Sequence, residues 1–215
     1  MRSNDELVDY LIRIGVLKTD YIIKAFREID RKDFVREEYK IYAYEDIPLP
    51  IGFGQTISQP FTVAFMTEAL EPKPGQKILE IGTGSGYQAA ILAKIVGEKG
   101  KVITIERIPE LAEFAKENLK KYNITNVEII VGDGSLGFEK EAPYDRIIVT
   151  GAFPQIPNHL LNQLKEEGII VVPVGYGVQR MKKIIKKRDD IIVLDLGPFR
   201  FVPIIGEKGF RRDFL

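Results

Sequence analysis

The hydrophobic positions near the start of the chain repeat at helical spacing. Apolar residues recur every three or four positions over residues 7–14 and again over residues 22–29, with Gly15 between the two runs. This spacing predicts two short helices. Residues 31–59 show no long period and contain several prolines, glycines and aromatic residues, so we expect an irregular segment there. Long irregular segments in compact domains are often functional.

From residue 60 the pattern becomes regular. Pro60 suits a first helical turn and opens a helix that is expected to reach Leu70. Further apolar runs predict strands over residues 77–81, 102–106, 127–131, 146–150 and 168–174, with helices over 87–96, 109–122 and 158–165. This alternation predicts an α/β fold with a parallel sheet and helices on both faces. Two final strands, 181–187 and 191–196, are expected to form an antiparallel pair across the turn Arg188-Asp189-Asp190.

The length of 215 residues suits a single domain. We divide it into a helical extension with an irregular loop, a regular core, and a C-terminal hairpin with its tail. These three parts are expected over residues 1–59, 60–175 and 176–215.

Charge and composition narrow the class of protein. There are 31 Lys and Arg against 31 Asp and Glu, so the formal net charge is zero and no general attraction to nucleic acid is expected. The one dense basic cluster, residues 180–188, is interpreted as a solvated edge strand, because lysines discourage edge pairing. The absence of Cys excludes disulfides, thiolate metal sites and a cysteine nucleophile. The single histidine, His159, has no evident metal partners in the sequence and is interpreted as structural or superficial.

The hydropathy of the chain bears on its location. No apolar run approaches the roughly 20 residues of a membrane span, and the first residues carry acids where a signal peptide needs an apolar stretch. We therefore expect a cytoplasmic protein with no membrane partner.

A glycine-rich turn follows the first strand of the core. It reads Gly82-Thr83-Gly84-Ser85-Gly86 and leads directly into the helix expected over residues 87–96. Ligands of open parallel sheets bind beyond the carboxyl ends of the strands, and glycines there let the backbone approach a ligand closely. The glycine spacing differs from the G-x-G-x-x-G of dinucleotide-binding proteins, and no Gly-Lys-Ser/Thr follows as in a P-loop.

Two acidic residues mark the ends of the next two strands. Glu106 stands twenty residues after Gly86 and is placed to accept hydrogen bonds from both hydroxyls of a ribose. Asp133, followed by Gly134, is placed to accept from the exocyclic amine of adenine. Either acid alone is equally well explained as a surface or turn residue. Together, in order at successive strand ends, they predict a site for an adenosyl ligand.

These elements resemble the Rossmann-like class I methyltransferases, which use S-adenosylmethionine. Residues 78–86 resemble their first motif, Glu106 their ribose acid, and Asp133-Gly134 their adenine-contacting pair. The resemblance implies a set of donor-binding residues: Glu80, Gly82, Thr83, Gly84, Ser85, Gly86, Glu106, Arg107, Asp133 and Gly134.

The irregular segment points to one family within that class. Residues 49–60, Leu-Pro-Ile-Gly-Phe-Gly-Gln-Thr-Ile-Ser-Gln-Pro, resemble the signature of protein-L-isoaspartate O-methyltransferases. Residues 144–152, 171–175 and 201–203 are similar to further segments of that family. The resemblance implies that Ser58 is the catalytic residue. It also implies a set of substrate-binding residues: Thr56, Ile57, Ser58, Val202 and Pro203.

The local chemistry of residues 56–60 is consistent with that role. In an extended segment Thr56 and Ser58 face the same side, and Pro60 keeps Gln59 out of the α region. Two hydroxyls and nearby backbone amides can then receive a carboxylate or a peptide backbone. The residues alone leave an alternative of equal weight, in which Ser58 caps the helix that starts at Pro60.

The resemblance implies a protein-repair reaction. A methyl group passes from S-adenosylmethionine to the free α-carboxylate of an L-isoaspartyl residue, leaving S-adenosylhomocysteine. The ester then closes to a succinimide that hydrolyses partly to normal aspartate. A carboxylic acid with a pKa of about 4 is already ionised near pH 7, so no general base and no metal are expected. Catalysis is expected to come from in-line positioning and desolvation.

Three other functions remain open at this stage. One is a methyltransferase that acts on RNA or a small molecule, although the neutral charge disfavours RNA. Another is a dehydrogenase-type nucleotide binder, and the last is a non-catalytic binder of the adenosyl ligand. The sequence leaves the oligomeric state, the preference among peptide contexts and the activity on D-aspartyl residues undetermined.

Overall fold

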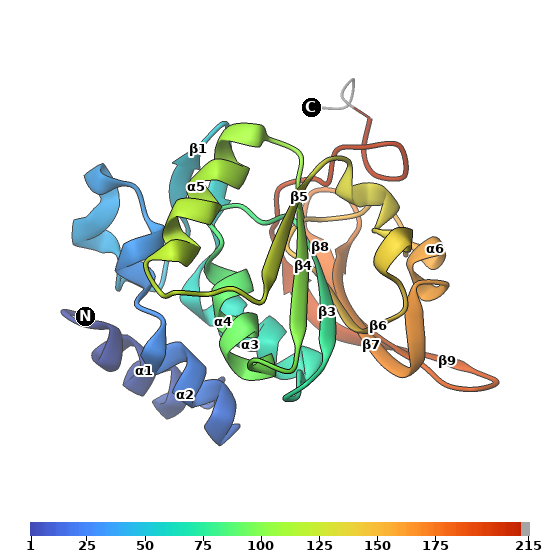
Figure 1. Ribbon diagram of the computed structural model, residues 1–215, viewed down its shortest axis with the longest axis horizontal. Coiled ribbons are helices and arrows are strands. Elements are labelled where there is room, and N and C mark those ends of the chain that lie inside the picture. Colours follow the sequence, from blue (N-terminus) through green and yellow to red (C-terminus); the bar gives the residue numbers. More distant parts are fainter. Residues whose placement is uncertain (212–215) are drawn as a thin grey trace.

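The computed structural model describes residues 1–211 and is built around one seven-stranded sheet. The strands lie in the order β5-β4-β3-β6-β7-β8-β9 (Figure 1). The five from β5 to β7 are parallel, and β8 and β9 are antiparallel to their neighbours. Their bounds are Lys77–Ile81 for β3, Lys101–Glu106 for β4, Val127–Val131 for β5, Tyr144–Val149 for β6, Leu164–Val174 for β7, Gln179–Lys186 for β8 and Ile191–Phe199 for β9.

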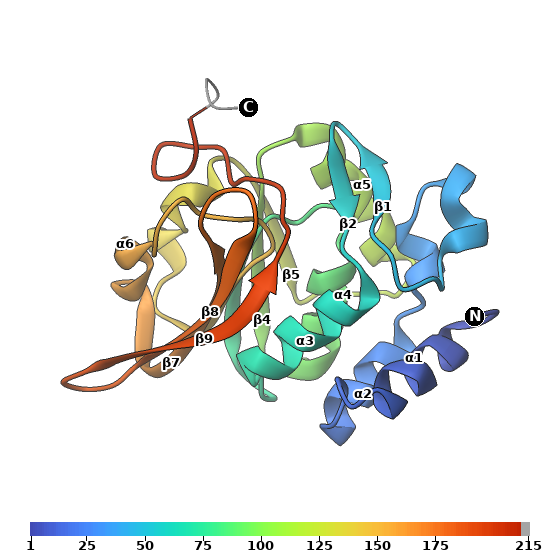
Figure 2. The same cartoon turned by 180° about the vertical axis from the view of Figure 1, so that it is seen from behind.

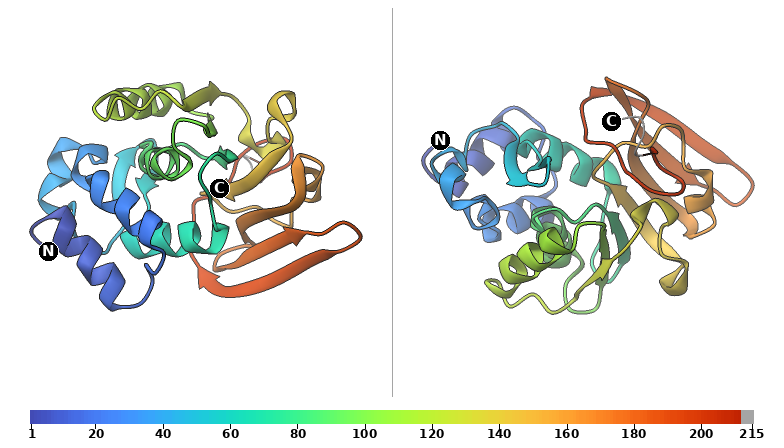
Figure 3. Two further views of the ribbon diagram at one scale, coloured as in Figure 1. Left: turned by 60° about the horizontal axis from the view of Figure 1, so that its bottom comes forward. Right: turned by 90° about the horizontal axis from the view of Figure 1, so that it is seen from above.

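Helices cover both faces of this sheet, but unequally. On one face lie α3 (Pro60–Leu70), α4 (Tyr87–Val96) and α5 (Pro109–Lys120). The other face carries the short α6 (Asn158–Leu161) and the 3₁₀ turns η3 (Gly134–Leu136) and η4 (Glu139–Glu141). Figure 3 shows the green helices on one side of the strands and the yellow-to-orange segment with α6 on the other. The predicted α/β sheet with helices on both faces and a C-terminal antiparallel pair is confirmed.

Alternating side chains of the central strands explain the two layers. Ile78, Val102 and Ile148 pack toward α3 and α4, whereas the next residue of each strand packs toward α6. Strands buried on both faces read as continuous apolar runs, which is why the sequence pattern predicted them closely. In residues 1–211 no helix combines the length and the hydropathy of a membrane span.

The N-terminal part contains the two predicted helices, α1 (Asn4–Arg13) and α2 (Asp20–Glu28). Ser3 caps α1 by accepting a hydrogen bond from the Glu6 amide at 3.2 Å. Two 3₁₀ turns follow, η1 (Arg31–Phe34) and η2 (Glu37–Tyr42). The expectation of a wholly irregular segment up to residue 59 is wrong, because β1 (Leu49–Gly52) and β2 (Gln55–Ile57) form an antiparallel hairpin.

Two further expectations need correction. The helix expected over 158–165 ends at Leu161, and β7 begins at Leu164. The Gln163 carbonyl accepts from the Tyr144 amide of β6, and Lys186 donates to the carbonyls of Leu161 and Leu164, so partners from the sheet replace helical hydrogen bonds.

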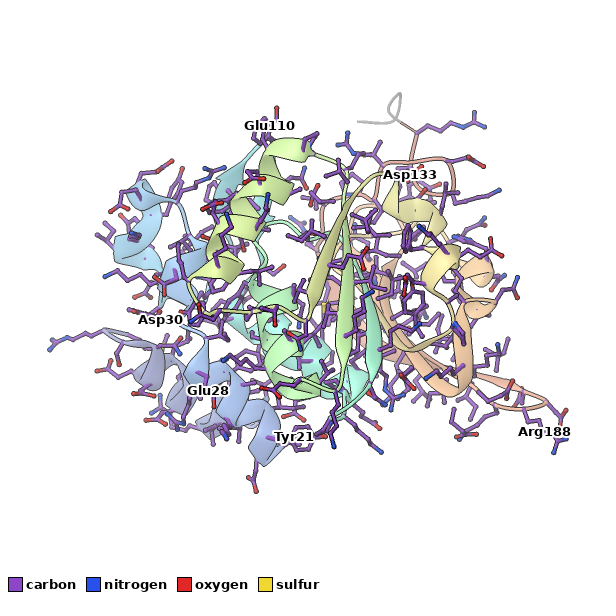
Figure 4. All side chains as sticks on the ribbon, viewed as in Figure 1. Tyr21, Glu28, Asp30, Glu110, Asp133 and Arg188 are labelled. Carbon is purple, nitrogen blue, oxygen red and sulfur yellow. The ribbon has the colours of Figure 1, made fainter. Side chains whose placement is uncertain are left out.

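The basic cluster is not an edge strand. It occupies β8, which lies between β7 and β9, so the edge is β9. Arg180 and Lys182 both pair with Asp195 of β9, and Lys183 pairs with Glu71. Arg188 marks the tip of the β8–β9 hairpin, well away from the body of the molecule (Figure 4).

Candidate active site

A cleft opens at the carboxyl ends of β3, β4 and β6. Its walls come from the loop after β3, the end of β4, residues 55–58, residues 150–151 and the returning C-terminal segment 202–205. Figure 2 shows the β1–β2 hairpin and the C-terminal segment rising at the same end, on either side of these strand ends. All the donor- and substrate-binding residues expected from the sequence line this cleft, with the exceptions of Gly86 and Asp133.

Two positions of the loop require glycine for different physical reasons. Gly82 has φ +97°, and a Cβ there would clash with the Thr150 hydroxyl, which donates to the Gly82 carbonyl at 2.5 Å. Gly86 lies outside the cleft with φ +83°, and a Cβ there would approach the Cβ of Ala115 to 3.1 Å. Gly82 therefore lets Thr150, directly after β6, approach the backbone of the loop, whereas Gly86 allows α4 and α5 to pack closely.

Glu106 is buried beside the glycine loop. Its Oε2 accepts from the Gly84 amide at 2.9 Å and its Oε1 from the Ile108 amide at 3.0 Å. These two bonds fix the plane of the carboxylate at the cleft wall. Each oxygen retains a lone pair for a ligand hydroxyl.

Glu80 is fully buried at the cleft floor, and only one of its two carboxylate oxygens has a hydrogen-bond partner within residues 1–211. Thr104 donates to Glu80 Oε2 at 2.6 Å, and the hydroxyls of Thr83 and Thr104 are 2.7 Å apart. Within residues 1–211 Glu80 Oε1 has no hydrogen-bond partner. Burial raises the pKa of Glu80 to about 8, the charge of Glu106 adds to the rise, and the Thr104 bond opposes it. Such a group is suited to a cationic partner.

Thr104 is a site residue that the sequence patterns missed. It is fully buried in the centre of β4, where the run Lys101–Glu106 is otherwise largely apolar. A hydroxyl inside a buried strand needs a partner, and this is the signal that could have indicated it. Because Thr104 donates to Glu80, the Thr83 hydroxyl is left to donate to Thr104.

Asp133 accepts a backbone hydrogen bond on each of its carboxylate oxygens. Its Oδ1 accepts from the Ser135 amide and its Oδ2 from the Glu207 amide, both at 2.8 Å. Burial opposes ionisation, but these bonds and the Ser135 hydroxyl outweigh it and lower the pKa of Asp133. Figure 4 shows Asp133 at the end of the molecule where the C-terminal segment passes. Asp133 thus anchors that segment, and the neighbouring Gly134 lines the cleft.

Arg31 holds the loop that carries Ser58, and the sequence patterns did not indicate it. Its guanidinium is fully buried and donates to the carbonyls of Ala43 at 2.7 Å, Ile47 at 3.1 Å and Ser58 at 3.0 Å. Burial lowers the pKa of Arg31 to about 10, an effect that Tyr87 and Asp46 partly offset. This arginine clamp, in which Arg31 holds the Ser58 carbonyl, joins residues that are 27 positions apart in the sequence. No local sequence pattern reveals such a contact.

The start of α3 tests the interpretation of Ser58 as a helix cap. The N-cap residue is Gln59, whose φ −51° and ψ 135° show the expected extended conformation before Pro60. Within residues 1–211 the Gln59 side chain makes no capping hydrogen bond to α3. Instead, the Asp46 carboxylate accepts a hydrogen bond from the Phe61 amide at 2.8 Å. The interpretation of Ser58 as a helix cap is therefore wrong.

The C-terminal segment completes the cleft. The Val202 carbonyl accepts from the Ala152 amide at 2.8 Å, and the Ile204 amide donates back to Ala152 at 2.9 Å. This pairing brings Val202 and Pro203 to the end of β6. His159 lies outside the cleft, with Nε2 2.7 Å from the Ser135 carbonyl, in agreement with a structural histidine.

Together the sheet order β5-β4-β3-β6-β7, the glycine loop after β3 and the acid that ends β4 define a class I S-adenosylmethionine-dependent methyltransferase. Residues 2–209 match the family described as Protein-L-isoaspartate(D-aspartate) O-methyltransferase. The chain belongs to this family, which confirms the family indicated by the motifs.

Two relatives of this family are similar to the chain over nearly its whole length. The protein-L-isoaspartate O-methyltransferase of Staphylothermus marinus is 51% identical over 98% of this chain and 100% of its own length. That of Methanococcus aeolicus is 48% identical over 100% of this chain and 99% of its own.

Solved structures show the same fold. A protein-L-isoaspartate O-methyltransferase superposes with a TM-score of 0.86 at 35% identity, covering 95% of this chain and 66% of the other. The putative enzyme of Plasmodium falciparum, in complex with S-adenosyl-L-homocysteine, superposes with a TM-score of 0.86 at 27% identity, covering 95% of this chain and 99% of the other.

Proposed function

We propose that this chain transfers a methyl group from S-adenosylmethionine to the free α-carboxylate of L-isoaspartyl residues in damaged proteins and peptides. Its family is that of protein-L-isoaspartate O-methyltransferases. The observation that carries the proposal is one cleft with two chemically different sets of groups. Glu80 and Glu106 offer carboxylates, and Thr56 and Ser58 carry hydroxyls.

The donor side of the cleft fits S-adenosylmethionine. When bound, it supplies an electrophilic methyl group on a positively charged sulfur. The unpartnered Oε1 of Glu80 suits its ammonium group, and the Glu106 carboxylate suits the ribose hydroxyls. Gly134 and Arg107 line the part of the cleft assigned to the nucleoside. The structure of the Plasmodium falciparum relative in complex with S-adenosyl-L-homocysteine supports S-adenosylmethionine as the donor.

The acceptor side has a simple chemical task. An oxygen of the ionised α-carboxylate forms the bond to the methyl carbon, and the carbon–sulfur bond breaks with its electron pair going to sulfur. No proton moves, so the residues need only orient the carboxylate and exclude water. We assign this orientation to Thr56, Ile57 and Ser58, with Val202 and Pro203 on the facing segment. Arg31 fixes the backbone at Ser58.

A time course on an isoaspartyl peptide tests the proposal. With S-adenosylmethionine, reversed-phase chromatography coupled to mass spectrometry, with synthetic aspartyl and isoaspartyl peptides as standards, should show a methyl ester first, then a succinimide, and then an aspartyl peptide among the products. Ser58→Ala should slow ester formation while S-adenosylhomocysteine still binds. Persistence of the isoaspartyl peptide without ester, or a methyl group on a hydroxyl or amide, would contradict the proposal.

The remaining assignments follow from the same proposal. We infer one catalytic domain with parts at 1–59, 60–175 and 176–215, supported by a core that joins α1 and α2 to α4 and α5. The expected partners are damaged proteins and peptides, with neither nucleic acid nor membrane. The cytoplasmic location and the metal-free reaction stay predictions, which cell fractionation and assays with added chelator would test.

A further inference from the structure

The tip of the β1–β2 hairpin exposes an aromatic side chain. The strands pair from Leu49 with Ile57 to Gly52 with Gln55, so Phe53 and Gly54 form a two-residue loop. The Phe53 side chain is 55% exposed. It stands three residues before Thr56, which lines the cleft.

The backbone of this loop makes phenylalanine an unfavourable choice. Phe53 has φ +54° and Gly54 φ +70°, and tight hairpins of this kind need positive φ at both loop positions. Asn-Gly and Asp-Gly are the preferred pairs, since a bulky side chain is strained in the left-handed region. Local stability would therefore favour Asn at position 53, and burial gives little in return at an exposed ring. A strained, exposed aromatic residue next to a cleft suggests a role in binding.

The hairpin is fixed firmly enough to present this ring. Ile51 is fully buried, and its Cδ1 lies 3.4 Å from the position a Cβ would take on Gly84 of the donor-binding loop. The Ile51 carbonyl accepts from Arg36 Nε at 3.0 Å, and the Arg36 guanidinium lies 4.1 Å from the Phe114 ring centroid on α5. Thus the hairpin is anchored to both the glycine loop and α5, and its tip directly precedes Gln55, which lines the cleft. Figure 2 shows the hairpin at the end of the molecule where β3 and β4 end.

We propose that Phe53 is a docking residue for the peptide substrate and that its ring packs against an apolar side chain flanking the isoaspartyl residue. This inference rests on the proposed function. The chain reverses direction at Phe53 and Gly54, so the tip lies only about two residue lengths, or about 7 Å, beyond Thr56 along the hairpin. An extended peptide covers that span with about two residues. The ring therefore selects the sequence context of the damaged residue, while Thr56 and Ser58 receive its carboxylate.

The substitution that tests this proposal is Phe53→Asn, because its expected effect on peptide binding differs from its expected effect on stability. It removes the ring and creates the preferred Asn-Gly loop, so the melting temperature should stay constant or rise. Peptides with a central isoaspartyl residue and glycine flanks are compared with peptides in which one leucine is moved through each flanking position. In the unmodified chain one leucine position should lower KM about tenfold, which corresponds to about 1.4 kcal/mol.

Phe53→Asn should abolish that leucine preference and leave kcat on the all-glycine peptide unchanged. Phe53→Tyr should preserve it. Tyr21→Ala is the matched control, since Tyr21 is a 41% exposed aromatic residue on α2 at the opposite end of the molecule (Figure 4). It should preserve the preference as well.

Three results would overturn the inference: no leucine preference in the unmodified chain, an unchanged preference in Phe53→Asn, or an equal loss on all peptides together with a lower melting temperature. Failure of the unmodified chain to methylate any isoaspartyl peptide would instead overturn the proposed function, and this inference with it.

Discussion

Glu80 offers the sharpest test of how the cleft binds its donor, through the substitution Glu80→Gln. The variant keeps the shape of the side chain and can still accept the hydrogen bond from Thr104. It then places an NH₂ group where the unpartnered Oε1 lies, facing the ligand ammonium with a donor. The proposed charge-assisted bond is lost, which is worth about 1.5–3 kcal/mol.

The size of the effect depends on pH, because the pKa of Glu80 is raised to about 8. At pH 7 ionising this carboxyl costs about 1.4 kcal/mol, which cancels much of the bond. The affinity ratio between the unmodified chain and Glu80→Gln should therefore be about 1–3 at pH 6 and about 4–40 at pH 7.5. Binding near pH 7 should also release about 0.5–0.9 protons from the unmodified chain.

Isothermal titration with S-adenosylhomocysteine in buffers of different ionisation enthalpy measures both quantities. Glu110→Gln on the exposed start of α5 is the control for a change in net charge at the same end of the molecule (Figure 4). A ratio that does not change with pH, together with no proton release, would refute the assignment of Glu80 to the ammonium group.

Further predictions concern the acid at the end of β4, the arginine clamp and the pH dependence of stability. Glu106→Ala should weaken S-adenosylhomocysteine binding about 10- to 100-fold in titrations, because bonds to a charged group are lost; unchanged affinity would remove Glu106 from the site. Arg31→Lys leaves buried carbonyls unpaired, so it should destabilise the fold by about 2–4 kcal/mol in denaturant titrations and lower kcat, while a merely structural Arg31 would leave kcat intact in the folded fraction. Since Glu80 has a folded-state pKa raised above its usual value, the folded state holds the extra proton and stability should fall as pH rises from about 4.5 to about 8. Glu80→Gln should flatten that slope in thermal melts, and an unchanged slope would speak against the raised pKa.

The central strands could be predicted from the sequence because they are buried on both faces. Their apolar runs end at glycines or acids, and these residues mark the ends of β3 near Gly82 and of β4 at Glu106. The β1–β2 hairpin escaped prediction because its loop holds Phe53 where Asn is usual, and because Pro50 interrupts the alternation of a short strand. The position of β8 inside the sheet was missed because strand order is set by tertiary pairing.

The candidate site likewise contains some features that local sequence patterns predict and others that depend on tertiary contacts. The glycine loop and Glu106 follow from spacing along the chain, whereas the roles of Arg31 and Thr104 depend on partners far away in sequence. Asp133 follows a predictable strand end, but its two carboxylate oxygens are bound by amides that include Glu207, 74 residues later. Local patterns therefore locate a ligand site, and long-range hydrogen bonds decide which groups face it.

The most direct test of the function is a methyl-transfer assay on a matched pair of peptides. One contains a single L-isoaspartyl residue and its twin contains normal aspartate, and each is incubated with this chain and S-adenosylmethionine carrying a labelled methyl group. We expect base-labile label on the isoaspartyl peptide and none above background on its twin. Equal labelling of the two peptides, or labelling of neither, would contradict the proposed function.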